Sequence, residues 1–375
     1  MKQRADQAWD VVVIGAGIMG TGTAFELTRH GLRVLVLERS VPGAEASSAA
    51  AGILGAQVEA HADGPSFELS LFSRSLYPSW ATALAATTGI DVELRGSGVM
   101  RVAFDAKSAA RTRREHAFQR RHGCRVEALK QPELAQAVPA LSPEAQAALA
   151  FPDDARIDPP KLLRALRIAA ERQGAQFRSG TLVRRVESDG KRVRGVLLDD
   201  GTLVRGGHVV VAAGSWSSLV EGVPLPKGGV VPARGQIVEL TLPTPAFEPV
   251  LFGPGCYLVP RDDGRVLIGS TLEFVGYQRD VTAQAVRDLL DAALRLVPCL
   301  AQASLGRSWS NFRPYTQDMQ PIIGEAHLRG LLLATGHYRN GILLAPATAA
   351  LIKALVLGEK PPLALDPWSP KRRAR

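Results

Sequence analysis

The sequence predicts an α/β protein with more than one domain. Its 375 residues exceed the length of one average domain, so two are expected, not necessarily contiguous in the chain. An apolar strand at residues 11–14 runs through closely spaced glycines into a helix and a second strand, which is the order found in parallel sheets. Residues 180–217 instead alternate apolar and polar side chains between Asp-Gly turns, which predicts an antiparallel three-stranded meander.

Composition argues against several classes of protein. Hydrophobic residues make up 46% of the chain, enough for a large core. The cysteines, Cys124, Cys256 and Cys299, lie far apart and form no CxxC pair, so neither a disulfide framework nor a metal site is expected. No signal-peptide pattern is found at the N-terminus, and Lys353 interrupts the most apolar segment, residues 341–358, which makes it a poor membrane span. We therefore expect a soluble, cytoplasmic protein.

The net charge of +9 raises the alternative of nucleic-acid binding. Within residues 107–130 the charge is densest, and the arginines there are Arg111, Arg113, Arg114, Arg120, Arg121 and Arg125. Alanines and Phe118 recur between them at helical spacing. This pattern favours an amphipathic surface helix with a basic outer face, and a nucleic-acid role remains the alternative.

The first strand and helix carry a dinucleotide-binding pattern. Gly15, Gly17 and Gly20 stand in G-x-G-x-x-G spacing where the strand passes into the helix. Gly15 permits the tight turn, Gly17 lets a pyrophosphate approach the backbone, and Gly20 lets helix and strand pack closely. The N-terminus of the helix then faces the phosphates.

The residues after the second strand narrow the choice of cofactor. Glu38 can bind the ribose hydroxyls and, standing before Arg39, argues against a 2′-phosphate and so against NADP. Residues 46–56 are mostly small, and the hydroxyls of Ser47 and Ser48 can bond phosphate or ribityl oxygens of a large flat ligand. This segment favours FAD over NAD, although a buried alanine-rich helix is an alternative and spacing alone does not identify the cofactor.

Three stretches make the chain resemble a known family. They are VVVIGAGIMG, SSAAAGILGA and ATGHYRNGILLAPATA, and the meander that returns to the sheet at Ala213-Gly214 adds to them. The chain resembles the FAD-dependent amine oxidoreductases of the D-amino acid oxidase superfamily, most closely the glycine oxidases of bacterial thiamine biosynthesis. The resemblance covers nearly the whole chain and is weakest at residues 100–150. It implies non-covalent FAD, because residues 311–324 lack the cysteine that binds FAD covalently in sarcosine oxidases.

The resemblance also implies a discontinuous two-domain architecture. A Rossmann-like FAD-binding domain would gather residues 1–60, 150–225 and 310–375. The substrate-binding domain, residues 61–149 and 226–309, would supply an antiparallel sheet with flanking helices over the flavin.

The stretch GHYRNGILLAP, residues 336–346, carries the most specific part of the resemblance. A helix that begins at Gly341 presents free N–H groups and its positive dipole end to the flavin edge where negative charge builds on reduction. Arg339 in this loop can form a bidentate pair with a substrate carboxylate, as the arginine of the family motif does. His337 and Asn340 are expected to contact the loop or the cofactor, not to act as acid–base catalysts.

Two further substrate-binding residues are implied by the resemblance. Arg313 matches a second arginine that faces the carboxylate, and Tyr257 matches a tyrosine that donates its hydroxyl to the substrate. The chain departs from the pattern at Met319, where the family often has glycine, which puts the shape of that loop in question. Leu272 is expected near the substrate Cα. The expected cofactor contacts are Gly15, Gly17, Ile18, Met19, Gly20, Glu38, Arg39, Ser47, Ser48, Ala51, Gly52, Ile53, Val183, Gly214, Gly336, His337, Tyr338, Asn340, Gly341, Ile342 and Leu343.

The implied activity is oxidative deamination of glycine or a small N-substituted glycine. Arg339, Tyr257 and Arg313 would fix the carboxylate while a hydride leaves Cα for flavin N5, giving an imine that water hydrolyses and H₂O₂ from O₂. Three alternatives stay open: a D-amino acid or sarcosine-type enzyme that passes electrons to a quinone, a secondary-metabolism oxidase of an N-carboxymethyl amine, and an RNA-associated flavoprotein. The resemblance also suggests a homo-oligomer.

Overall fold

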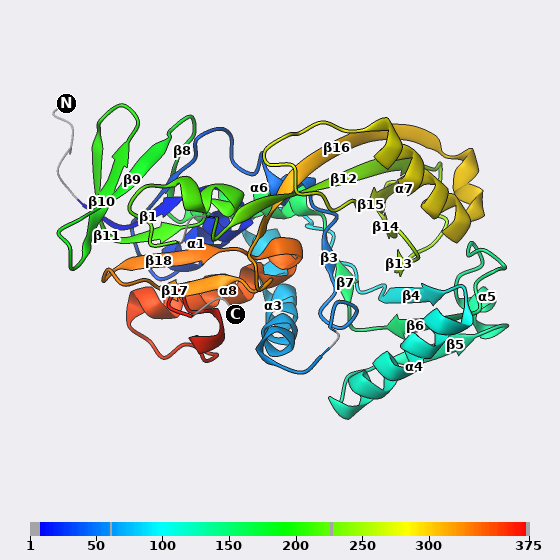
Figure 1. Cartoon of the computed structure of the whole chain (residues 1–375). Helices are drawn as coiled ribbons and strands as arrows, with labels where there is room; N and C mark the ends of the chain where they lie inside the picture. The colour runs from blue at the N-terminus through cyan, green and yellow to red at the C-terminus, as the bar shows by residue number, and fades with distance from the viewer. Residues whose placement is uncertain (1–7, 61, 226–227, 373–375) are drawn as a thin grey trace.

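A computed structural model describes residues 8–60, 62–225 and 228–372. The chain forms two eight-stranded sheets, which Figure 1 shows beside each other, each with its own helices. The strand order of the first sheet is β17-β18-β11-β1-β2-β8, and β10 and β9 extend from β11. Its bounds are β1 (Trp9–Ile14), β2 (Val34–Leu37), β8 (Gln176–Arg178), β9 (Val183–Ser188), β10 (Val193–Leu198), β11 (Leu203–Val211), β17 (Ile322–Glu325) and β18 (Leu331–Thr335).

The first sheet is parallel at its centre, and both of its faces are covered. The neighbours β18, β11, β1, β2 and β8 pair in parallel, whereas β17 pairs antiparallel at the edge. Every residue of β2 and β18 is buried, which explains their continuous apolar sequences. The predicted meander is β9-β10-β11, in which the first part of β11 pairs with β10 and the second part pairs with β1.

Helices cover one face of this sheet, and the meander covers the other. Val11, Val13 and Val36 point toward the helices, which are α1 (Ile18–Thr28), α3 (Pro65–Thr88), α6 (Pro159–Arg172) and α8 (Gly341–Leu357). Val12 and Leu35, on the opposite side, pack with the apolar side chains of the meander. The alternation along each strand divides the side chains between the two cores.

The second sheet has the strand order β16-β12-β15-β14-β13-β4-β6-β5. Its pairs are antiparallel, as expected, except that β13 and β4 pair in parallel. The strands are β4 (Val99–Ala103), β5 (Glu127–Lys130), β6 (Ala147–Phe151), β12 (Val231–Thr241), β13 (Val250–Phe252), β14 (Tyr257–Pro260), β15 (Arg265–Gly269) and β16 (Ser304–Tyr315). The helices of this half are α4 (Ala106–Arg121), α5 (Glu133–Ala137) and α7 (Ala283–Leu296).

The inner face of the second sheet meets the first domain. Ile237, Val259 and Leu267 form a core with Ala51 and Val58, whereas the outer face packs on α7. The segment that carries Ala51 includes the short helix α2 (Ala46–Ala49) and the strand β3 (Ile53–Leu54), which pairs with β7 (Ala155–Arg156). The small residues at 46–56 thus lie where the two domains meet. The alternative of a buried alanine-rich helix is wrong, because the helix there spans only Ala46–Ala49 and none of its residues is buried.

Two of the expected domain boundaries need correction. Residues of α3 were expected in the substrate domain, but Leu69, Tyr77 and Trp80 belong to the core of the first sheet. Ser73 Oγ also donates to the carbonyl of Leu343 in α8 (2.7 Å). Strand β16 reaches Tyr315 in the second sheet, so that sheet ends later than residue 309.

The apolar helix α8 is a core helix. Residues Tyr338–Leu357 are long and apolar enough to cross a bilayer by composition, but most of this segment is buried inside the protein. Its neighbours are α1 and α3, and Leu343, Leu351 and Ile352 are buried among them. Packing within the domain accounts for its apolar sequence.

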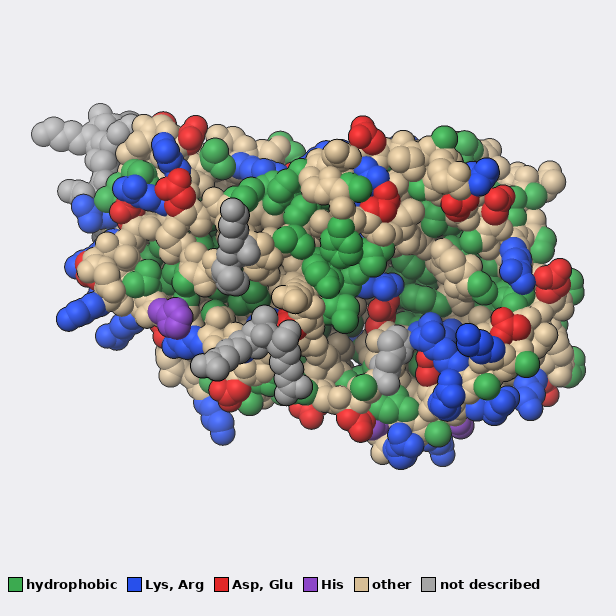
Figure 2. Space-filling model, in the orientation of Figure 1, with side chains coloured by type: hydrophobic (Ala, Val, Ile, Leu, Met, Phe, Trp, Pro, Cys, Tyr) green, Lys and Arg blue, Asp and Glu red, His purple; other side chains and the backbone are tan. Residues whose placement is uncertain are grey.

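The basic segment is the surface helix that the pattern predicts. On the inner face of α4, Thr112, Phe118 and Gln119 are buried. The lysine and arginines of this helix lie on its outer face, where Figure 2 shows a group of basic side chains. Ala117, expected on the inner face, is exposed. Part of the charge is paired, since Arg111 Nε lies 2.8 Å from Oε1 of Glu115.

Candidate active site

A cavity of about 480 Å³ lies between the two sheets. Its first wall is formed by the carboxyl ends of β1, β11 and β18 and the residues that follow them, where open α/β sheets bind ligands. Its opposite wall comes from β12, β14 and β16. The volume falls in the range of cofactor-sized pockets.

The glycines of the first motif shape the nucleotide end of the cavity. Gly15 has φ +99°, and a Cβ there would lie 2.6 Å from the carbonyl oxygen of Ala212, so a side chain is excluded on both counts. A Cβ on Gly20 would lie 1.9 Å from the carbonyl oxygen of Gly15, which explains its role in helix–strand packing. Gly17 lines the cavity at the start of α1.

Polar side chains hold this end in shape. Glu38 accepts from Ala16 N (2.9 Å) and Ser40 N (3.0 Å), so its carboxylate is fixed beside the cavity at the end of β2. Ser47 Oγ accepts from Ile18 N (2.9 Å) and so satisfies the first turn of α1. Ser47 therefore has a structural bond beyond its expected cofactor contact.

Arg39 lies between an acid and an aromatic ring. Its Nη2 is 2.7 Å from Oε1 of Glu45, and its guanidinium carbon is 3.9 Å from the centroid of the Trp216 ring. Arg39, Glu45 and Trp216 all line the cavity. The stacked pair of Trp216 and Tyr277, whose centroids are 5.2 Å apart, continues this wall into the loop before α7.

The three predicted substrate-binding residues come together at the other end. Tyr257, Arg313 and Arg339 line both the large cavity and an adjoining pocket of about 60 Å³. Tyr257 begins β14 and lies directly opposite Gly269, where a Cβ would lie 2.3 Å from its hydroxyl oxygen. Glycine at 269 therefore leaves room for the tyrosine ring.

Arg313 is held by its surroundings. Its guanidinium donates to Ser270 Oγ (2.6 Å), Thr271 O (3.1 Å) and Arg234 O (3.4 Å). A guanidinium has five N–H donors, so two remain for a ligand. The group lies flat against Gly235 of β12, where a Cβ would be only 2.2 Å from Nη2.

We expect Gly235→Ala to displace Arg313 without unfolding the protein. The clash is with the far end of a flexible side chain, so Arg313 can yield while the backbone stays in place. If Arg313 binds the substrate carboxylate, as the family resemblance implies, kcat/KM should fall roughly tenfold or more because that partner is misplaced. Steady-state kinetics with parallel measurement of bound flavin check this, and Gly96→Ala, where a Cβ meets nothing within 4 Å, is the control. Unchanged kinetics in Gly235→Ala would show that Arg313 does not bind the substrate.

The histidine of the 336–346 stretch is not an acid–base group. His337 is buried, its Nε2 lies 2.9 Å from Oγ1 of Thr348, and burial lowers the pKa of His337 to about 3. It is therefore neutral at physiological pH. Tyr338, at φ +47°, packs its ring edge-on against Tyr315 with centroids 5.1 Å apart.

Most of the predicted cofactor residues line one of the two cavities. Gly52, Ile53 and Asn340 line the smaller pocket. The large cavity is lined by Gly15, Gly17, Ile18, Met19, Glu38, Arg39, Ser47, Ala51, Val183, Gly214, His337, Tyr338, Gly341 and Ile342. Four predicted residues line neither: Gly20, Ser48, Gly336 and Leu343. Gly20 and Gly336 serve close packing and a turn, and Leu343 is buried in the core.

Two departures from the family pattern have clear outcomes. Met319 takes φ +55°, a conformation that glycine adopts freely, so the loop keeps the shape that glycine would permit at some backbone strain. Leu272 is 51% exposed and is not among the residues lining either cavity. Its expected position near the substrate Cα is not supported.

Sequence reasoning missed several lining residues. Ala212, Ser215 and Thr335 follow β11 or end β18, and the rule that ligands bind at the carboxyl ends of parallel strands could have found them. Trp216 and Glu59 had no such signal.

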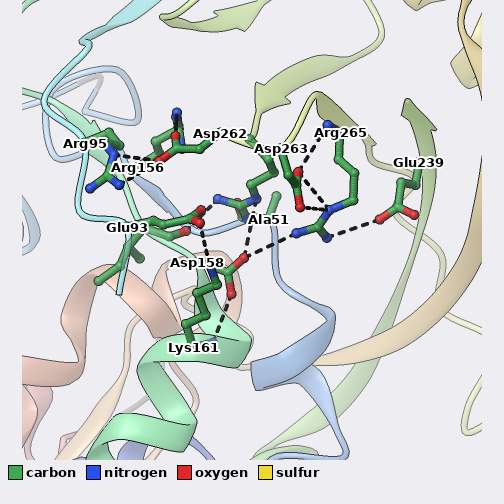
Figure 3. A network of polar contacts seen from close by, with 12 residues as sticks. Ala51, Glu93, Arg95, Arg156, Asp158, Lys161, Glu239, Asp262, Asp263 and Arg265 are labelled. Carbon is green, nitrogen blue, oxygen red and sulfur yellow. Dashed lines mark hydrogen bonds and ion pairs between the residues drawn. The ribbon is translucent and has the colours of Figure 1, made fainter. Parts of the chain in front are cut away.

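A network of buried charges fastens the small-residue segment to the second sheet. Arg261, 1% exposed, donates from Nη2 to Ala51 O and from Nη1 to Ile157 O, both at 2.8 Å. Figure 3 shows the surrounding contacts, in which Asp158 accepts from Lys161 N (2.9 Å) and lies 3.8 Å from Nη2 of Arg265. Ala51 lines the cavity, so this network ties the cofactor wall to the hairpin that carries Tyr257.

Comparison with known proteins identifies the family. The FAD dependent oxidoreductase (DAO) profile matches residues 10–355. The chain belongs to this family. It is 38% identical to a glycine oxidase of Geobacillus kaustophilus over 96% of each chain. It is also 38% identical to the bifunctional protein ThiO/ThiG of a Synechocystis strain, covering 97% of this chain but only 54% of that protein.

Solved structures agree with this assignment. The crystal structure of glycine oxidase from Geobacillus kaustophilus superposes with a TM-score of 0.94 at 36% identity, covering 98% of this chain and all of the other. Iminodiacetate oxidase from Chelativorans superposes with a TM-score of 0.87 at 28% identity, covering 96% of this chain and 98% of the other. The predicted fold class, FAD cofactor and class of FAD-dependent amine oxidoreductases are confirmed.

The residues present fit FAD. The cavity runs from Glu38 and Gly15, beside the start of α1, to Arg313 and Tyr257, and glycine stands where a side chain would fill its floor. The start of α8 at Gly341 lines the middle of the cavity and presents its N-terminal N–H groups there. With FAD bound, these features would supply a phosphate site, a ribose acceptor and a positive helix end.

Proposed function

We propose that this protein is an oxidase of glycine or a small N-substituted glycine. The observation that carries the proposal is the convergence of Arg339, Arg313 and Tyr257 at one end of the FAD cavity. Two guanidinium groups and a phenol match a single carboxylate next to a small space of about 60 Å³. The similarity to glycine oxidases of comparable length supports the same substrate class.

The side chains bind and orient the substrate. Arg339 and Arg313 pair with its carboxylate, and Tyr257 donates a hydroxyl hydrogen bond, which together limit the rotation of Cα. FAD held along the large cavity would supply the acceptor for a hydride from Cα and the means of passing the electrons to O₂. His337 is neutral and buried against Thr348, so it is poorly placed to take a proton from the amine. The second sheet covers the opposite side of the cavity and reduces the access of water.

The visible spectrum of the purified protein tests the proposal. A flavin spectrum that bleaches on anaerobic addition of glycine or sarcosine, and returns in air with formation of H₂O₂, is the expected result. A flavin spectrum that responds to neither amine would overturn the substrate assignment. Bleaching followed by slow reoxidation in air would overturn the oxidase assignment and favour a quinone acceptor.

We also propose a wider setting for the enzyme. We place the enzyme in the cytoplasm and in thiamine biosynthesis, as a homo-oligomer that binds no nucleic acid. The basic face of α4 then serves as a solvated surface. Salt-sensitive tRNA binding that disappears when Arg113, Arg114, Arg120 and Arg121 are neutralised would contradict this part of the proposal.

A further inference from the structure

A carboxylate lies inside the site, beside the arginine that we assign to the substrate. Glu59 lines the small pocket together with Tyr257, Arg313 and Arg339. Its Oε1 is 3.7 Å from Nη2 of Arg339, and the Glu59 side chain is 24% exposed. This separation makes an ion pair but is too long for a hydrogen bond, so N–H donors of Arg339 stay available for a ligand.

The turn that carries Glu59 is fixed by hydrogen bonds to the buried carboxylate of Asp154. Asp154, fully buried, accepts from Gln57 N (3.0 Å) and Val58 N (2.8 Å) and pairs with Arg74 Nη1 at 2.5 Å. Glu59 N in turn donates to Gly55 O (3.2 Å). Because its backbone is fixed by these bonds, Glu59 presents its carboxylate to the pocket as a built part of the site.

The charges that line the small pocket match one carboxylate. Two arginines and one glutamate, Arg313, Arg339 and Glu59, sum to a single positive charge. A monocarboxylate with a neutral amine neutralises that charge. A second carboxylate on the amine would leave an uncompensated negative charge close to Glu59 in a partly desolvated space, where like charges repel strongly.

We propose that Glu59 restricts the enzyme to amines with a single carboxylate and rejects N-carboxymethyl amines that carry a second one. Specificity then comes from a repulsive group inside the pocket as well as from the two attractive arginines. This inference rests on the proposed function, because it names the substrate class of the same site.

Two non-reactive ethers that differ by one carboxylate test the inference independently of turnover. Methoxyacetate carries one carboxylate and diglycolate carries two, and each can be titrated into the FAD-loaded enzyme through the change in flavin absorption. The wild-type protein should bind methoxyacetate roughly tenfold or more tightly than diglycolate. Glu59→Gln, which keeps the size of the side chain and removes its charge, should reduce that ratio roughly tenfold.

Turnover gives the second measurement. The ratio of kcat/KM for sarcosine to that for iminodiacetate should fall in Glu59→Gln by a similar factor. Glu68→Gln, which changes an exposed glutamate at the start of α3, should leave both ratios unchanged. Equal ratios in wild type and Glu59→Gln would overturn the inference while leaving the proposed function intact. If no amine is oxidised, the proposed function fails and the ligand titration alone decides the role of Glu59.

Discussion

Arg339→Ala should lower kcat/KM for glycine roughly 150-fold, which corresponds to a loss of about 3 kcal/mol in transition-state stabilisation. The substrate carboxylate loses a charged partner, and Tyr257 and Arg313 remain to hold it. This loss is at the low end of the range for breaking a buried ion pair, because the Arg339 side chain is 47% exposed before substrate binds. The loss should fall mainly on KM, since the carboxylate is bound equally in the ground state and in the transition state.

Two variants separate recognition of the carboxylate from other effects of Arg339. Arg339→Lys keeps the charge but loses the bidentate geometry, so it should fall between wild type and Arg339→Ala. Arg329→Ala removes an exposed arginine in the turn before β18 and should behave as wild type. Steady-state kinetics on protein of equal flavin content make the comparison. A near-normal KM in Arg339→Ala would show that another group binds the carboxylate.

Local sequence was sufficient to predict the strand–helix–strand unit that lines one end of the large cavity. Gly15, Gly20 and Glu38 lie within a single strand–helix–strand unit, so their spacing along the chain determines their spacing in space. The turn at residues 262–264 sets the register that puts Gly269 opposite Tyr257, whereas the expected role of Tyr257 came from the family resemblance.

Contacts between distant segments could not be predicted in this way. Gly235 lies under the Arg313 guanidinium only because β12 and β16, nearly eighty residues apart, pair in one particular register. The apolar stripe of α3 shows that the helix is partly buried but not which sheet it packs on. Glu59 stands in a turn with no periodic pattern, and its place beside Arg339 depends on the distant carboxylate of Asp154.

Substitution of Arg261, the buried arginine that donates to Ala51 at the cavity, should have a second large effect, on stability. Arg261 is nearly inaccessible to solvent, and burial lowers its pKa to about 10, so it remains charged at neutral pH. Its nearest acid, Asp158, is 4.0 Å away, and its hydrogen bonds go instead to the carbonyls of Ala51 and Ile157. The cost of burying this charge is therefore offset mainly by satisfying two carbonyl groups that have no access to water.

Arg261→Met should lower the free energy of unfolding of the FAD-loaded protein by about 3 kcal/mol. Methionine fills much of the space but donates nothing, so both carbonyls lose their partner, and Asp158 loses one of its two neighbouring arginines while Arg265 stays 3.8 Å away. Urea unfolding measures the loss, and Arg287→Met, at a surface arginine whose side chain is 67% exposed, should change stability by less than about 0.5 kcal/mol.

FAD should also bind roughly tenfold more weakly to Arg261→Met, because Ala51 lines the cavity and its segment loses its link to the second sheet. If stability falls while the affinity for FAD is unchanged, Arg261 supports the domain contact alone, and the cofactor wall is held by the β3–β7 pair.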